Sequence, residues 1–166
     1  MSSPPSVPMS VPIGSSASSP SLTTLNSGTQ EWRLHGRLHR LDGPAFLRAD
    51  GTQAWYAHGK HHRVTGPAIT CSDGSHMWYI DGKRHRLDGP ASLSSTGIQK
   101  WYAEDRIHRL DGPAVIHPDG TEEWWIHGYN ITSVSAHQKM EYIRTYLATR
   151  EQASPNAACA VVNTDT

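Results

Sequence analysis

Residues 78–100 read WYIDGKRHRLDGPASLSSTGIQK, and residue 101 begins the same pattern again. The pattern recurs every 23 residues without insertion or deletion, and its copies open at Trp32, Trp55, Trp78, Trp101 and Trp124. Four full copies and the start of a fifth share the form W-[Y/R/W]-x-x-G-x-x-H-R-x-D-G-P-A-x-x-x-x-D-G-x-x-x. A fixed short period is typical of repeat architectures, in which each unit packs mainly on its neighbours.

Each unit contains two stretches that favour extended structure. One surrounds the tryptophan, as in QAWYA at 53–57, and the other follows Gly-Pro-Ala, as in AVI at 114–116. Asp-Gly pairs at 50–51, 73–74 and 119–120 predict tight hairpin turns between them, and Thr96-Gly97 replaces the pair once. The other connection, G-x-x-H-R-x-D-G-P, predicts a longer shaped loop because of its glycines and proline.

These elements predict an all-β fold built from a repeat array of antiparallel β-hairpins. Five tryptophan strands and four Gly-Pro-Ala strands give one elongated, twisted meander sheet of about nine strands. Side chains alternate between the faces of a strand, so the residue after each tryptophan should lie on the opposite face. That column is variable and mostly aromatic, with Arg33, Tyr56, Tyr79, Tyr102 and Trp125.

The ends of the chain differ from the array at 30–131. Residues 1–29 carry no charged side chain and hold ten Ser and five Pro, which predicts a disordered tail, and the polar segment 153–166 predicts another. Residues 132–152 predict a helix that caps the last strands, with Ala136, Met140, Ile143 and Leu147 on its apolar face. Ser135 and Gln138 have capping-box spacing. A dimerising or partner-binding helix is the alternative.

Composition bounds the function. The 15 basic and 15 acidic side chains cancel, which excludes a strongly basic nucleic-acid binder and an acidic tail protein. No apolar run approaches the ~18 residues of a membrane span. Only two cysteines, Cys71 and Cys159, and no secretory signal pattern favour a reducing, cytoplasmic setting, or host cytoplasm or virion for a phage or viral chain.

Eleven histidines raise the question of a metal site, and the ladder histidines are His39, His62, His85 and His108. Equivalent residues two strands apart should lie about 9.6 Å from one another, too far for two neighbours to share one zinc ion. We therefore expect a structural histidine that hydrogen-bonds within its own loop, with neither metal nor cofactor. Polar features in four copies also argue against the single asymmetric constellation of an enzyme.

The unit resembles the MORN repeat, another 23-residue β-hairpin unit with an aromatic residue three positions before a glycine. The segments Tyr56–Gly59, Tyr79–Gly82 and Trp125–Gly128 match that spacing over about residues 30–131. MORN units usually carry glycine after the histidine, whereas arginine stands there in this chain. The resemblance implies an extended antiparallel sheet and a scaffolding, protein-binding or sometimes lipid-binding role, without catalytic residues.

The sequence thus predicts a non-catalytic scaffold for protein–protein interaction or self-assembly. The candidate contact residues are the aromatic column and the arginine row, namely Tyr56, Tyr79, Tyr102, Trp125, Arg40, Arg63, Arg86 and Arg109. The repeated tryptophans and histidines are expected to be structural. A reader of nucleic acid or anionic lipid through the arginine row is the alternative, although the region around the row carries as many acidic as basic residues.

Overall fold

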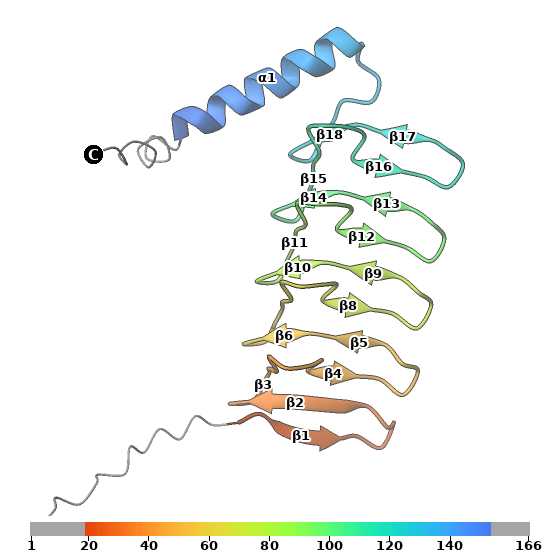
Figure 1. The fold of residues 1–166 in the computed structure, drawn as a ribbon, viewed down its shortest axis with the longest axis vertical. Coiled ribbons are helices and arrows are strands. Elements are labelled where there is room, and N and C mark those ends of the chain that lie inside the picture. The colour runs from red at the N-terminus through yellow and green to blue at the C-terminus, as the bar shows by residue number, and fades with distance from the viewer. Residues whose placement is uncertain (1–18, 154–166) are drawn as a thin grey trace, which may run out of the picture.

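The computed structural model describes residues 19–153 as a stack of β-hairpins with a helix across one end (Figure 1). The repeats follow one another along the long axis, and the turns that join β4 to β5, β8 to β9, β12 to β13 and β16 to β17 all lie on one side of the stack. This open antiparallel meander confirms the predicted fold class. Of the tails predicted at 1–29 and 153–166, residues 1–18 and 154–166 lie outside the described residues.

Within residues 19–153, the long sheet has 11 strands, ten of which follow one another in space. In that spatial order they are β1 (Ser21–Thr24), β2 (Gln30–Leu34), β4 (Phe46–Leu47), β5 (Gln53–Ala54), β8 (Ile69–Thr70), β9 (His76–Met77), β12 (Ser92–Leu93), β13 (Gln99–Lys100), β16 (Val115–Ile116) and β17 (Glu122–Glu123). The eleventh, β3 (Arg37–Leu38), pairs with β2. Nine of the ten in the series are the predicted tryptophan and Gly-Pro-Ala strands.

The tenth strand corrects the predicted N-terminal boundary. Residues 21–24, assigned to a disordered tail, form β1 and pair with β2 in the register Leu22 to Trp32. A turn at Leu25–Thr29 joins them, closed by the Leu25 amide donating to the Thr29 carbonyl at 2.8 Å. Low hydrophobicity did not prevent a strand here, because the edge of β2 supplies backbone partners for a segment rich in Ser and Thr.

Each tryptophan after the first lies at a branch point between two strands. The Trp55 amide donates to the Ala68 carbonyl of the long sheet at 2.7 Å, and the Trp55 carbonyl accepts from the His62 amide at 3.1 Å. The backbone therefore leaves the long sheet at the tryptophan and enters a separate two-stranded hairpin. The expected long loop is thus partly wrong, because its first half is this hairpin.

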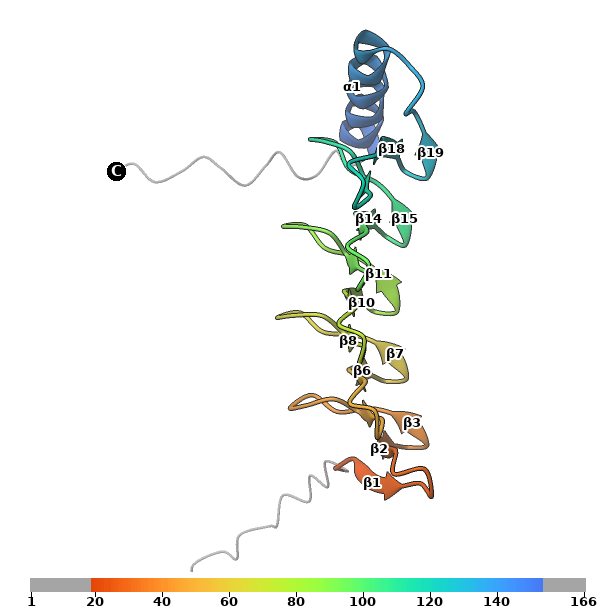
Figure 2. The same cartoon turned by 90° about the vertical axis from the view of Figure 1, so that its right-hand side faces the viewer.

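The small hairpins stack along one side of the array, where β3, β7, β15 and β19 project together (Figure 2). They pair β6 (Tyr56–Ala57) with β7 (Lys60–His61), β10 (Tyr79–Ile80) with β11 (Lys83–Arg84), β14 (Tyr102–Ala103) with β15 (Arg106–Ile107), and β18 (Trp125–Ile126) with β19 (Tyr129–Asn130). Both residues of each turn have positive φ, as two-residue type I′ hairpins require. Asp105 adopts φ 68° where the other repeats have glycine, so the turn survives the exchange.

The array has a thin core made mainly of small side chains. The alanines of the Gly-Pro-Ala motif, Ala45, Ala68, Ala91 and Ala114, are fully buried. In the first four units, the carbonyl of each accepts the amide of the tryptophan that opens its unit, at 2.7–2.8 Å. No large side chain among the described residues is fully buried, in keeping with a single sheet that has little apolar surface to cover.

Helix α1 (Ala136–Ala153) covers the last repeat, and its Ile143 packs with Ile126 and Ile131. The capping box is confirmed, since the Gln138 amide donates to Ser135 Oγ at 3.3 Å and the Ser135 amide to Gln138 Oε1 at 3.0 Å. The predicted apolar face is wrong except at Ile143, because Ala136, Met140 and Leu147 are exposed.

We expect Ala91→Leu to lower the free energy of unfolding by about 1–3 kcal/mol, because the site has no room for additional methylene groups. Urea unfolding followed by tryptophan fluorescence measures the change. Ala49→Leu, at an exposed position in a turn, is the matched control and should leave the midpoint almost unchanged. Equal midpoints for the two variants would contradict tight packing around Ala91.

Candidate interaction surface

The arginine row packs against the tryptophans of the array. In each of the first four repeats, the guanidinium carbon lies 3.9–4.3 Å from the centroid of a tryptophan ring in the same repeat. We call this set the Trp–Arg ladder, and its pairs are Trp32 with Arg40, Trp55 with Arg63, Trp78 with Arg86, and Trp101 with Arg109. Such contacts are cation–π interactions and are strongest when the cation is partly desolvated.

The rest of the motif holds the guanidinium in place. Arg86 Nε donates to Asp88 Oδ1 at 2.9 Å, and its Nη1 donates to the Pro90 carbonyl at 3.4 Å. A Cβ atom at Gly89 would lie 3.0 Å from the guanidinium carbon, so a larger residue there would push the arginine side chain aside. The same contacts recur around Arg109. The R-x-D-G-P segment therefore forms one loop whose aspartate, glycine and proline all contact its own arginine side chain.

In this arrangement the arginine side chains are largely buried in the loop, and the aspartate side chains face the solvent. The side chains of Asp42, Asp88 and Asp111 are 81–83 % exposed, whereas those of their arginine partners are 23–26 % exposed. Hydrogen bonds from arginine lower the pKa of each of these carboxyl groups, so they are ionised at neutral pH. The row predicted to attract anions thus presents carboxylates to solvent.

The second repeat is the exception, because Thr65 stands where the others have aspartate. Arg63 lies 3.9 Å from the centroid of the Trp55 ring, and its Nη1 donates to the Pro67 carbonyl at 3.2 Å. Within the described residues no carboxylate forms an ion pair with Arg63. The exposed residue two positions after the arginine is therefore acidic in the first, third and fourth repeats and neutral in the second.

The aromatic column has its own partners. The Tyr56 ring stacks on His61 with centroids 4.1 Å apart, and the Tyr79 ring lies 5.2 Å from the same histidine. Tyr102 is only 7 % exposed and its ring lies beneath the guanidinium of Arg84 at 4.2 Å. Trp125 donates from Nε1 to Glu123 Oε2 at 2.8 Å. Tyr102 therefore offers little surface to a partner, and the other three are half-buried.

Three of the four ladder histidines join neighbouring repeats, whereas the buried Nδ1 of His85 has no hydrogen-bond partner among the described residues. Nδ1 of His39 accepts the His58 amide at 3.0 Å, and Nδ1 of His108 accepts the His127 amide at 3.1 Å. Nδ1 of His62 likewise lies 3.2 Å from the Asp81 amide nitrogen. A structural role fits these contacts, but the expected bond within the same loop is wrong. The first residue of each type I′ turn does not use its amide within the hairpin, so that amide is free to donate to the preceding repeat.

A row of aliphatic side chains lies between the arginines and the aspartates in sequence. We call it the aliphatic row, and its members are Leu41, Val64, Leu87 and Leu110. The first three are 79, 76 and 89 % exposed. The site prediction missed this row, although the unlabelled x of H-R-x-D-G-P is aliphatic in all four copies. An aliphatic residue repeated within a polar loop was the available signal.

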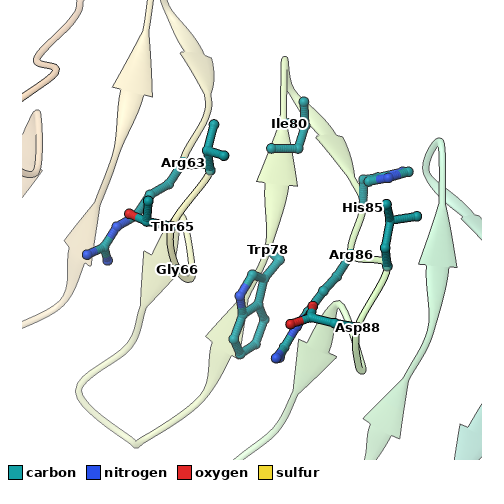
Figure 3. A pocket seen from close by; sticks show the side chains of 10 residues that line it. Arg63, Thr65, Gly66, Trp78, Ile80, His85, Arg86 and Asp88 are labelled. Carbon is teal, nitrogen blue, oxygen red and sulfur yellow. The ribbon is translucent and has the colours of Figure 1, made fainter. Parts of the chain in front are cut away.

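Open grooves run between successive loops beside this row. The groove between the second and third repeats has a volume of about 760 Å³ and is lined by Val64, Trp78, Ile80, His85 and Leu87, among others. Figure 3 shows Trp78 beside Arg86 and Asp88 on one side of it, with Arg63 and Thr65 on the other. The neighbouring grooves have volumes of about 590 and 400 Å³.

At the end of the array, α1 covers the corresponding surface. Leu110, Trp124 and Ile126 occupy the same repeat positions as Val64, Trp78 and Ile80, and they pack against the cluster that contains Ile143 or belong to it. Lys139 lies over the Trp124 ring at 5.0 Å, where the earlier repeats have arginine. The helix thus takes the place of a fifth arginine loop and covers the last member of the aliphatic row.

Two further features bear on function in residues 19–153: clusters that could bind a metal, and helices that could cross a membrane. Among these residues no group of three or more His, Cys, Asp or Glu side chains is placed to hold a metal ion. Across residues 19–153 no helix combines the length and apolar character that crossing a membrane requires. No protein-family model matches the chain, and no curated protein sequence matches it. The resemblance to MORN repeats therefore stays a prediction.

We expect the free energy of unfolding to fall as the pH drops from about 7 to about 5. His108 and His127 lie 4.9 and 5.7 Å from the Tyr146 ring of α1, and burial is the main cause that lowers the pKa of both. The charge of His127 lowers the pKa of His108 further, Arg106 does the same for His127, and Arg150 adds a smaller effect at both. The unfolded histidines bind protons first, near pH 6.5, so acid favours unfolding.

Urea unfolding at pH 7.5 and pH 5.0 measures this slope. The double variant His108→Asn/His127→Asn keeps an acceptor at residue 108 and a residue that tolerates positive φ at 127, so it should fold with a smaller pH dependence. His137→Asn, at an exposed position of α1, is the control and should retain the full slope. An unchanged slope in the double variant would contradict the assignment.

We expect Arg86→Lys to lower the free energy of unfolding by about 1–2 kcal/mol. Lysine keeps the charge but loses the planar contact with Trp78 and the fork to Asp88 and the Pro90 carbonyl. Arg48→Lys is the control, because Arg48 is exposed and lies 3.4 Å from Asp50 at a turn. Equal urea midpoints for the two variants would show that charge alone, without stacking, accounts for the arginine.

Proposed function

We propose that this chain is a non-catalytic repeat scaffold that binds a partner protein through the aliphatic row. The observation that carries the proposal is the exposure of Leu41, Val64 and Leu87 beside a series of open grooves, while Leu110 is covered by α1. Large aliphatic side chains exposed at one position in three successive repeats form an ordered apolar surface, and such surfaces mark interaction sites. The resemblance to MORN repeats and the small number of cysteines support an interaction module in a reducing, cytoplasmic compartment.

The proposal moves the contact surface away from the residues favoured by sequence. The arginines are packed on tryptophan rings, and the aromatic column is packed on His61 and Arg84. Both sets are held by contacts within the array, and the proposal does not place them against the partner. Repetition fits this role, because equivalent loops at regular intervals present the same apolar contact several times along one binding face.

Binding of nucleic acid or anionic lipid remains the alternative function, and one observation favours it. Arg63 is the member of the arginine row beside which no carboxylate stands, because Thr65 replaces the aspartate. A single guanidinium flanked by exposed Asp42 and Asp88 provides little attraction for a polyanion. Protein binding through the apolar row is therefore the better supported function.

We expect the double variant Leu41→Ser/Leu87→Ser to fold normally and to lose its partner. Both side chains are exposed, so the urea midpoint should change little, while the apolar contact disappears. Affinity capture from the native cell, followed by mass spectrometry, should then recover a specific protein with the wild-type chain but not with the double variant. Leu22→Ser, at an exposed leucine of β1 outside the row, is the control and should retain that protein.

If the wild-type chain, the double serine variant and Leu22→Ser all recover the same proteins, the proposal is wrong. Binding of RNA or anionic vesicles at low salt, abolished by Arg63→Gln but not by the serine variants, would instead support the alternative.

A further inference from the structure

Helix α1 shows which kinds of side chain pack against the array. Lys139, Ile143, Tyr146 and Arg150 follow one another at i, i+4, i+7 and i+11, which is one stripe of a helix. Lys139 lies over Trp124, Ile143 is buried against Ile126 and Ile131, and Tyr146 stacks on His108. The stripe that faces the array therefore reads cation, aliphatic, aromatic, cation.

The open part of the aliphatic row presents a surface that is continuous with the one that α1 covers. Successive grooves share Val64 and then Leu87 as common walls, and the next groove along includes Leu110, which packs under the helix. In the open grooves the arginine loop of the following repeat is present, so a ligand there lies along the loop tips and not over the tryptophan ring. The basic side chains of such a ligand would then lie close to the exposed aspartates of the loops.

Charge along the row has a pattern that complements such a helix. Asp42 and Asp88 are exposed carboxylates at either end of the segment Leu41 to Leu87, and neutral Thr65 stands between them. Two repeats of a sheet span about 19 Å. The stripe from Lys139 to Arg150 spans about 17 Å along a helix axis. The two lengths agree within the reach of a lysine or arginine side chain.

We propose that Leu41, Val64 and Leu87 bind an amphipathic helix of a partner protein. Its contact stripe carries an aliphatic and an aromatic side chain between two cations, as the stripe of α1 does. The cations pair with Asp42 and Asp88, and the apolar side chains lie against Val64 and its neighbours. This inference rests on the proposed function and adds the chemical class of the partner: a helix laid along the loop tips across the open grooves, selected by charge at both ends.

A synthetic peptide with the sequence of residues 134–150 is the probe, because it carries the stripe of α1. Labelled at its N-terminus, it is titrated with the full chain while fluorescence anisotropy is recorded. We expect binding that weakens as salt rises, that falls at least tenfold in Val64→Ser, and that falls similarly in Asp42→Asn/Asp88→Asn. Asparagine still accepts the arginine hydrogen bond, so the loops should keep their shape.

Matched controls separate the row from other surfaces. Leu22→Ser and Asp119→Asn remove an exposed leucine and an exposed carboxylate outside the row, and both should bind the peptide like the wild-type chain. A peptide with Lys139→Glu and Arg150→Glu should bind at least tenfold more weakly. Equal binding of both peptides, or indifference to the Val64 and aspartate variants, would overturn the inference.

Three further outcomes show which part of the inference is wrong. Peptide binding that depends on Leu110 alone would mean that the peptide displaces α1, and it would overturn the inference. A dimer in analytical ultracentrifugation that Val64→Ser dissociates, without peptide binding, would assign the row to a second copy. Loss of the captured partner in Leu41→Ser/Leu87→Ser, with neither peptide bound, would overturn the helix class and leave the proposed function standing.

Discussion

The guanidinium packed between a tryptophan ring and a glycine is the contact that the rest of the array depends on. It packs on the tryptophan that lies at the branch between two sheets, leaves little space for a side chain at the glycine of its loop, and hydrogen-bonds the aspartate and the proline carbonyl. A cation–π contact is worth about 0.5–2 kcal/mol, depending on its desolvation. The contact recurs in four consecutive repeats, so its effect accumulates along a sheet whose apolar core is thin.

The period and the turn residues were enough to predict the sheet. Strands, tight turns and the left-handed Asp105 follow from local backbone preferences, which each repeat expresses independently. The small hairpins were missed because only one of their turns, Asp81-Gly82, has the Asp-Gly pair that signals a tight turn, and the others have His-Gly or Glu-Asp. The inter-repeat bond of His39 was missed because the turn that supplies the amide is 19 residues away.

The site was predicted less well, and the reason is the direction in which side chains point. A row of arginines beside aromatic residues is an equally good pattern for an anion-binding surface and for a buried cation–π stack. Only the fold shows that Arg86 turns inward while Asp88 and Leu87 turn outward. Helix α1 gives the same lesson, because Lys139 finds a tryptophan and Met140 is left in solvent, whereas hydrophobicity alone predicts the reverse.

Exposed leucines in a polar loop need a reason, because local folding does not require them. The stack at Trp78 uses Arg86, Asp88, Gly89 and Pro90, whereas the Leu87 side chain between them is 89 % exposed. A leucine exposed to this extent contributes little burial to the folded array. The one member that has a structural use is Leu110, and it has that use only because a helix covers it. The other three occupy the equivalent repeat positions without that cover, and we propose that a partner from outside the array covers them.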